Sequence, residues 1–274
     1  MNLPNNFSFS QHNLQDFVDC PRRFLLKYIQ KVAWPAIQSE PVRELERHMD
    51  LGIRFHKIIH QMYLGMDRSI LVNEDDEIEL KIWIQNHLAV PELWNFQKCF
   101  PETTLTATLS GYRIIAKFDL IAVTKDGDLR ILDWKTSKRK PNRGALQNRL
   151  QTRIYPWVLY RSLEKLIPGI KYQPSQISMI YWFADYPGDK EIFSNDQAKL
   201  DEDEGFLSTL IGSISATPTE GFYKTTDERM CRFCSYRSYC DRGTEAGDLS
   251  ELDDISSVDD SLNVSFSDVE EIQF

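Results

Sequence analysis

The chain has 274 residues, of which 42% are hydrophobic, and its net charge at pH 7 is −9. This length and composition can bury the core of one large domain. No stretch approaches 18 consecutive apolar residues, and the first six residues have neither a basic start nor an apolar core, which argues against a membrane-spanning helix and a signal peptide. We therefore expect a cytoplasmic protein with no membrane partner.

The negative charge is concentrated at the C-terminus. Residues 243–274 contain ten Asp or Glu and no Lys or Arg, which leaves residues 1–242 with a net charge of +1. We predict one folded domain over 1–242 and an acidic, disordered tail over 243–274. The tail is either an inert solubilising segment, or it docks on a partner or shields the basic groove as a phosphate mimic.

Helical patterns dominate the first hundred residues. Ser10 is a candidate helix cap, Leu14, Phe17 and Val18 follow at helical spacing, and Cys20-Pro21 ends that helix before a second one begins. Further along, the periodicity predicts helices over 42–64 and 74–88, a loop over 91–101, a strand over 103–109, a helix over 145–166, a strand over 175–183 and a helix over 198–214.

The most informative stretch is a hairpin. Residues 117–123 and 129–136 are rich in apolar and β-branched side chains and flank an Asp126-Gly127 turn signal. A two-residue turn would set Asp119 opposite Trp134, whereas a three-residue connection ending in a left-handed Gly127 would set Asp119 opposite Asp133. We predict the second arrangement, because only that one gathers the polar residues of the two strands.

Three polar side chains in this hairpin predict chemistry. Asp133 and Lys135 leave the same face of a strand, and Asp119 would join them across the ladder. Carboxylates are suitable ligands for Mg²⁺ or Mn²⁺, and a neighbouring lysine can assist a water molecule and offset phosphate charge. The alternative is an exposed hairpin face that carries ordinary charges.

These residues resemble a known family. Asp119 followed by Asp133-Trp134-Lys135 is similar to the signature of the PD-(D/E)XK nuclease superfamily, and Gln151 with Tyr155 matches the Gln-x-x-x-Tyr motif of its RecB-like branch. Gly52-x-x-x-His56 resembles the motif whose histidine binds metal in several members. The resemblance implies a restriction-endonuclease-like α/β core, in which a central mixed sheet is flanked by helices. It also implies that His56, Asp119, Asp133 and the Trp134 carbonyl bind metal.

Four cysteines form a second signal. Cys231, Cys234 and Cys240 lie on one short segment, supply three thiols that can converge on a cluster or metal, and could be completed by Cys20. Disulfides are not expected in a cytoplasmic enzyme, and zinc more usually draws paired Cys-x-x-Cys motifs. One early and three late cysteines resemble the 4Fe-4S clasp of RecB-like nucleases, including the CRISPR-associated and AddB families, which would join the N- and C-terminal helical segments. Cys99 lies outside this pattern.

Basic residues follow Lys135 directly. Between positions 138 and 153 the chain contains six Lys or Arg and no acid. They are either a solvated charge run or a phosphate-binding surface, and their position beside the proposed metal site favours the second. We predict nucleic-acid contacts from the following residues: Lys138, Arg139, Arg149, Gln151, Arg153 and Tyr155.

Together these observations predict a Mg²⁺- or Mn²⁺-dependent phosphodiester hydrolase. We expect a DNA exonuclease that acts on single strands or DNA ends, with Asp119, Asp133 and Lys135 as its catalytic residues. The expected setting is DNA repair, recombination or CRISPR adaptation, with a helicase or an adaptation protein as a possible partner. The alternative is a nuclease fold kept as a catalytically weak or inactive DNA-binding subunit of such a complex.

Overall fold

A computed structural model describes residues 3–4, 6–33 and 40–244, so that the acidic residues 245–274 lie outside the described part. Its strands are β1 (Ser8–Ser10), β2 (Lys98–Leu109), β3 (Tyr112–Val123), β4 (Leu129–Lys135), β5 (Ile177–Phe183) and β6 (Tyr186–Ser194). Its α-helices are α1 (Gln11–Asp19), α2 (Pro21–Phe24), α3 (Glu40–Tyr63), α4 (Arg68–Leu71), α5 (Ile78–Leu88), α6 (Arg143–Asn148), α7 (Leu150–Leu166) and α8 (Gln197–Ala216). A π-helical turn spans Leu25–Ile29, and short 3-10 turns span Pro91–Leu93, Pro174–Gln176, Thr219–Gly221 and Glu228–Cys231.

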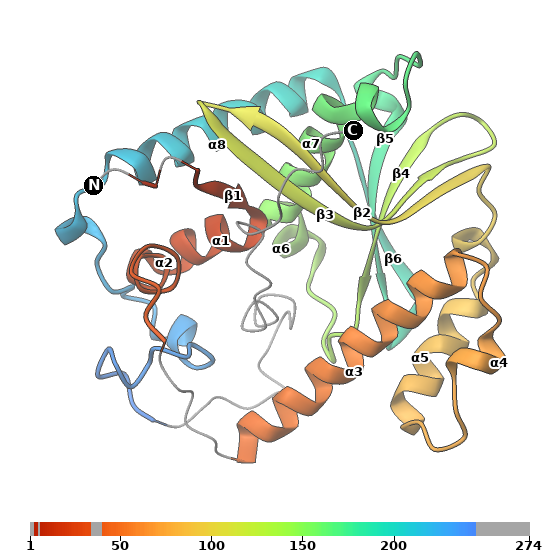
Figure 1. Ribbon diagram of the computed structural model, residues 1–274, viewed down its shortest axis with the longest axis horizontal. Coiled ribbons are helices and arrows are strands. Elements are labelled where there is room, and N and C mark those ends of the chain that lie inside the picture. The colour runs from red at the N-terminus through yellow and green to blue at the C-terminus, as the bar shows by residue number, and fades with distance from the viewer. Residues whose placement is uncertain (1–2, 5, 34–39, 245–274) are drawn as a thin grey trace.

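The strands form one mixed sheet. Its order is β1-β3-β4-β5-β6, and β2 pairs with β3 off this path. The pairs β1–β3 and β4–β5 are parallel, whereas β2–β3, β3–β4 and β5–β6 are antiparallel. Figure 1 shows α7 and α8 on one side of the sheet and α3 and α5 on the other. This arrangement confirms the predicted α/β fold with a mixed sheet flanked by helices.

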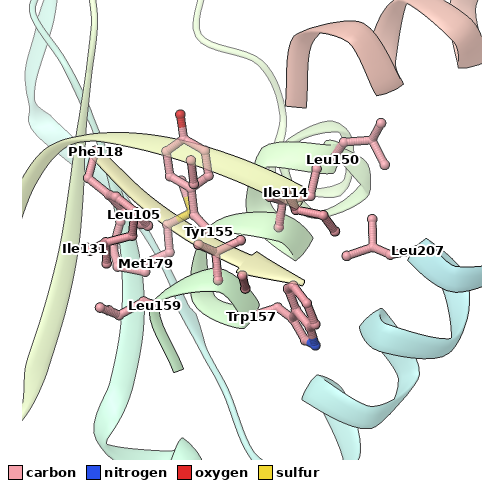
Figure 2. Packing of buried hydrophobic residues seen from close by; sticks show 14 of the residues in the cluster. Leu105, Ile114, Phe118, Ile131, Leu150, Tyr155, Trp157, Leu159, Met179 and Leu207 are labelled. Carbon is pink, nitrogen blue, oxygen red and sulfur yellow. The ribbon is translucent and has the colours of Figure 1, made fainter. Parts of the chain in front are cut away.

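The larger core lies between the sheet and α1, α7 and α8. Phe118 of β3, Ile131 of β4 and Met179 of β5 lie close to Tyr155 of α7 in this core (Figure 2). Alternate residues of each strand are apolar on this face, which is why the strands bury it. The helix α7 therefore covers the same face of β4 from which the side chains of Asp133 and Lys135 project.

The smaller core lies under α3 and α5 and is unusually aromatic. His87 is fully buried and makes edge contacts with the rings of Trp94, Trp134 and Trp182, whose centroids lie 5.1, 4.5 and 5.0 Å away. Among the described residues, neither ring nitrogen of His87 has a hydrogen-bond partner. Burial and then the nearby His56 lower the pKa of His87 to about 3, so the ring is neutral at physiological pH.

The two ends of the described chain lie side by side. The N-H of Arg22 donates to the Tyr223 carbonyl at 3.0 Å, and the rings of Phe24 and Phe222 stack with centroids 6.1 Å apart. The helix α1 starts at the predicted cap, because the Ser10 hydroxyl accepts from the N-H of Asn13. Within the described residues, no helix has both the length and the apolar character needed to cross a membrane.

Several element boundaries differ from the predictions. The strand β2 begins at Lys98, inside the segment expected to be a loop. Pro101 does not end the strand, since it occupies a ladder position opposite Leu120. The predicted helix over 74–88 begins only at Ile78, and the predicted helix over 145–166 is two helices that break at Arg149, whose ψ is 140°. The edge strand β6 was not predicted, since its alternation is weak. Val18, which follows Leu14 and Phe17 at helical spacing, is 51% exposed.

Candidate active site

The connection between β3 and β4 has the predicted odd length. The N-H of Thr124 donates to the Asp128 carbonyl at 2.8 Å, which leaves three residues between them, and Gly127 has a φ of +86°. Only a residue without a Cβ adopts this conformation at low cost. The ladder pairs Leu120 with Leu132, so that Asp119 and Asp133 come next as neighbours across the two strands. The predicted register is therefore confirmed.

A second carboxylate meets Asp119 from the other side. In the ladder of β2 and β3, Pro101 pairs with Leu120 and Thr103 pairs with Phe118. Glu102 lies between the two pairs on β2 and Asp119 between them on β3, so these two acids are opposite each other. The backbone of Glu102 is left-handed, with a φ of +48°, a conformation that costs a side-chain-bearing residue of order 1 kcal/mol. Phe118 and Leu120 are two residues apart and would share one face of a regular strand. Phe118 instead packs in the larger core and Leu120 in the smaller one, so β3 changes faces at Asp119. Both acids thus occupy a local irregularity of the sheet.

His56 completes a trio with these two acids. One ligand atom each from His56, Glu102 and Asp119 lie within 4.8 Å of one another, and His56 Nδ1 lies 3.3 Å from Asp119 Oδ1. The other oxygen of Asp119 accepts the N-H of Trp134 at 2.8 Å, which holds the carboxylate in place. Two carboxylates and an imidazole form a donor set that suits Mg²⁺ less well than Mn²⁺, which accepts nitrogen more readily.

The trio differs from the ligand set expected from the sequence. Glu102 was left out of that set, although the sequence contains a signal for it in the turn between β2 and β3. Ser110 and Gly111 have φ values of +52° and +82° and form a two-residue turn that pairs Leu109 with Tyr112. Counting back along both strands from this turn sets Glu102 opposite Asp119.

The imidazole of His56 and the neighbouring carboxylates favour each other's charged forms. Burial alone would lower the pKa of His56, but Asp119, Asp133 and Glu102 outweigh it and raise the pKa to about 9. Burial likewise favours the neutral form of Asp119, yet His56, the Trp134 N-H and Lys135 bring the pKa of this carboxyl below its usual value. The site is therefore built for positive charge among carboxylates, which a divalent cation can provide in place of a proton.

Asp133 belongs to a second, adjacent group. Its Oδ2 lies 2.9 Å from Lys135 Nζ, which donates in turn to Gln151 Oε1 at 3.0 Å, and the Gln151 amide donates to the other oxygen of Asp133. All three residues are at most 5% exposed. Gln151 was expected to contact nucleic acid, and the structure instead ties it to the carboxylate and the ammonium. Asp133 remains close enough to His56 to raise its pKa.

The other predicted nucleic-acid residues divide into two groups. Lys138 and Arg139 are exposed just after β4, and Arg149 is partly exposed between α6 and α7. Arg153 instead forms ion pairs with Asp203 at 2.6 Å and Glu202 at 3.2 Å, and so fastens α7 to α8. Tyr155 is buried against Phe118, with 4.7 Å between ring centroids, and burial followed by the charge of Asp133 raises its pKa.

The basic run is also less free than its sequence suggested. Lys140 Nζ lies 3.0 Å from Glu191 Oε1, and Arg143 donates to the other oxygen of Glu191 at 2.9 Å. Glu191 comes from β6, the strand that the sequence did not predict. The positive surface beside the site is therefore smaller than the run of six cations implied, and it is centred on Lys138 and Arg139.

The four cysteines of the second motif line one pocket, next to Arg23 and Lys224. In the described part of the chain, which holds all five cysteines, none forms a disulfide. Burial raises the pKa of Cys231, Cys234 and Cys240, so these thiols are poor nucleophiles on their own. The described structure thus brings the early cysteine and the three late ones together around one pocket.

The chain was compared with curated proteins, with solved structures and with models of protein families. No curated protein matches the chain. Among solved structures, the crystal structure of the protein SSO0001 is 17% identical, with a TM-score of 0.42 over 88% of each chain. A candidate exonuclease from Eubacterium rectale is 11% identical, with a TM-score of 0.47 over 78% of this chain and 85% of that one. The family model of the PD-(D/E)XK nuclease superfamily matches residues 8–241, and the chain belongs to this superfamily.

Proposed function

We propose that the chain is a Mg²⁺- or Mn²⁺-dependent deoxyribonuclease that acts as an exonuclease on single-stranded DNA or DNA ends. The observation that carries this proposal is the convergence of His56, Glu102 and Asp119 beside the Asp133–Lys135 pair. Such a combination places metal ligands next to a fixed ammonium, as hydrolysis of a phosphodiester requires. Membership of a nuclease superfamily supports the same reaction class.

Each residue has a role in this proposal. His56, Glu102 and Asp119 would hold the metal, with Asp133 and the Trp134 carbonyl as the further ligands that the family resemblance implies. A bound divalent ion would supply an activated water molecule and offset the negative charge that develops on the phosphate oxygens. Lys135 would orient that water and face the phosphate, and Gln151 would hold the lysine and Asp133 in position. Lys138, Arg139 and Arg149 would bind the phosphate backbone.

The biological setting is a finer proposal. We place the chain in the RecB-like branch, on the strength of the Gln151–Tyr155 spacing and of the four cysteines in one pocket. DNA repair, recombination and CRISPR adaptation are the pathways in which such an enzyme would act, with a helicase or adaptation protein as its partner. We also propose that residues 1–242 form one nuclease domain, followed by the acidic tail.

End-labelled DNA tests the proposed reaction. The wild type with Mn²⁺ should shorten single-stranded DNA, and Lys135→Ala should abolish cleavage while Mn²⁺ binding, measured by calorimetry, persists. Parallel lanes with duplex DNA, circular single strands and RNA would define the substrate. A wild type that binds Mn²⁺ but leaves every substrate intact would contradict the proposal.

A second candidate function is a DNA-binding subunit without hydrolysis. The observation that favours it is the closed network of Asp133, Lys135 and Gln151, in which the ammonium already has two partners and is 4% exposed. If that network does not open, the lysine cannot reach a phosphate. Tight DNA binding without cleavage by the wild type would support this function over the first.

We further propose that Cys20, Cys231, Cys234 and Cys240 bind a 4Fe-4S cluster that fastens the N-terminal helices to residues 222–242. The gathering of the four cysteines in one pocket supports this proposal, and nearby cations such as Arg23 and Lys224 would offset the negative charge of the cluster. Protein purified without oxygen should absorb broadly near about 400 nm and contain iron. Stoichiometric zinc without iron would refute this assignment.

A further inference from the structure

The helix α3 lies directly on the residue that follows Lys135. His48 Nε2 lies 2.8 Å from the Thr136 carbonyl oxygen, with both side chains buried. One turn further along α3, a Cβ on Gly52 would come within 2.9 Å of Thr136 Oγ1, closer than real Cβ contacts allow. The backbone of α3 therefore lies closer to the Thr136 side chain than a residue with a Cβ would allow. The His48 hydrogen bond to the Thr136 carbonyl is a second contact between the same helix and the same residue.

His48 is itself held from its other side. Its Nδ1 lies 3.2 Å from Glu79 Oε1 of α5, and its ring meets Trp83 edge-on with centroids 5.2 Å apart. The same Glu79 oxygen lies 4.0 Å from Lys138 Nζ, which stands just beyond Thr136 in the chain. Both ring nitrogens of His48 thus face oxygen atoms, and the ring links α3, α5 and the end of β4.

The same helix carries the histidine of the metal trio. His56 is eight residues after His48, which is about two turns or about 12 Å along the axis. A helix of this kind is rigid over two turns because each turn is hydrogen-bonded to the next. A change in how α3 sits on Thr136 must therefore also move His56 relative to Asp119, whose partner Trp134 is two residues before Thr136.

We propose that His48 is a positioning residue that, with Gly52, docks α3 on Thr136 and thereby sets the distance between His56 and the carboxylates of the metal trio. Glu79 and Trp83 flank the imidazole, whose Nε2 faces the Thr136 carbonyl. Outer-shell hydrogen bonds of this kind tune metal affinity in other sites. The inference rests on the proposed function, because it assumes that the trio binds a divalent ion.

The first test compares two replacements of His48. His48→Leu removes the donor, whereas His48→Gln can still present an N-H near the position of Nε2. His48→Leu should weaken Mn²⁺ binding, measured by calorimetry, by about ten-fold, and His48→Gln should recover most of that loss. Cleavage by His48→Leu should need more Mn²⁺ for half-maximal rate but approach the wild-type rate at saturation. The matched control is His60→Leu, because His60 lies on the same helix beyond the trio.

The second test does not depend on His48. Gly52→Ala should push α3 away from Thr136 and weaken Mn²⁺ binding to a similar degree. Gly52→Ala with Thr136→Ala should recover the affinity, since the nearest remaining atom, the Cβ of residue 136, is 3.9 Å away. This pair keeps the inference testable if His48→Leu fails to fold, which circular dichroism would reveal.

Three results would overturn the inference. If the wild type binds Mn²⁺ and the His48→Leu or Gly52→Ala variant binds it equally well, the docking of α3 does not position His56, and the proposed function stands. If the wild type binds no Mn²⁺, the inference and the proposed function fall together. Equal losses in His48→Leu and His48→Gln, together with a lower rate at saturating Mn²⁺, would also overturn it, because they indicate general damage to the fold.

Discussion

Replacing Glu102 by Gln tests the residue that the structure adds to the metal site. The substitution keeps the size and one oxygen but removes the charge, so the geometry at the irregular point of β2 is preserved. Loss of a charged ligand should weaken Mn²⁺ binding at least about ten-fold, or about 1.4 kcal/mol. The effect on the metal-free protein should be small, because two consequences of the same change oppose each other.

The first consequence is the loss of an ion pair. Glu102 Oε2 lies 2.6 Å from Lys117 Nζ, whose side chain is 55% exposed, and pairs of this kind contribute about 0–1 kcal/mol. The second is relief of the repulsion between Glu102 and Asp119, which face each other across the ladder. The free energy of unfolding of the metal-free variant should therefore stay within about 1 kcal/mol of the wild type.

Thermal unfolding with and without Mn²⁺ measures both quantities. At a free Mn²⁺ concentration 100 times the wild-type Kd, binding stabilises the wild type by about 2.7 kcal/mol, and a ten-fold weaker site gains about 1.4 kcal/mol at the same concentration. The Mn²⁺-induced rise in Tm should thus be roughly halved in Glu102→Gln. The control is the exposed Glu220, replaced by Gln. Equal Mn²⁺-induced shifts in the wild type and Glu102→Gln would refute the role of Glu102 as a ligand.

Three further outcomes follow from the structure. Lys135→Ala should remove cleavage without weakening Mn²⁺ binding by more than about three-fold, because the lysine is not a ligand, as calorimetry on the variant would reveal. Since the pKa of His87 is about 3 in the folded chain against 6.5 for the free side chain, only the unfolded state takes up this proton between those values. Stability should therefore fall as the pH drops from 6.5 towards 4, by up to about 3 kcal/mol, and His87→Leu should flatten this part of a urea-unfolding pH profile. If the proposed cluster is present, Cys231→Ser should lose iron on elemental analysis and expose residues 222–242 to early proteolysis, whereas Cys99→Ser should keep the iron and stay resistant.

Local chemistry accounts for the parts of the site that could be predicted. The register of Asp119 and Asp133 followed from one glycine, since a left-handed Gly127 requires an odd connection and leaves one pairing of the strands. The start of α1 followed from the Ser10 hydroxyl in the same way. In both cases the determining interaction joins residues that are close in sequence, so the pattern contains all the information needed.

The turn at Ser110-Gly111 sets Glu102 opposite Asp119, but the sequence does not reveal the backbone distortion at this point of the two strands. Regular alternation along β2 and β3 cannot keep Phe118 in one core and Leu120 in the other. The chain does so only by accepting a left-handed backbone at a residue with a side chain, which sequence propensity disfavours. Strain of this kind is retained where it places a functional group, here a carboxylate opposite Asp119.

For the basic run, the sequence predicted more than the structure contains. Six cations without a neighbouring acid in sequence predicted a continuous positive surface, but Glu191 of β6 and Asp203 of α8 neutralise Lys140 and Arg153 from 50 residues further along the chain. A charge run specifies a surface only after its long-range partners are known, and those partners depend on how β6 and α8 pack. The phosphate contacts should therefore be sought at Lys138 and Arg139, where exposure and closeness to Lys135 coincide, and charge reversal at Lys140 should disturb the β6 edge more than DNA binding.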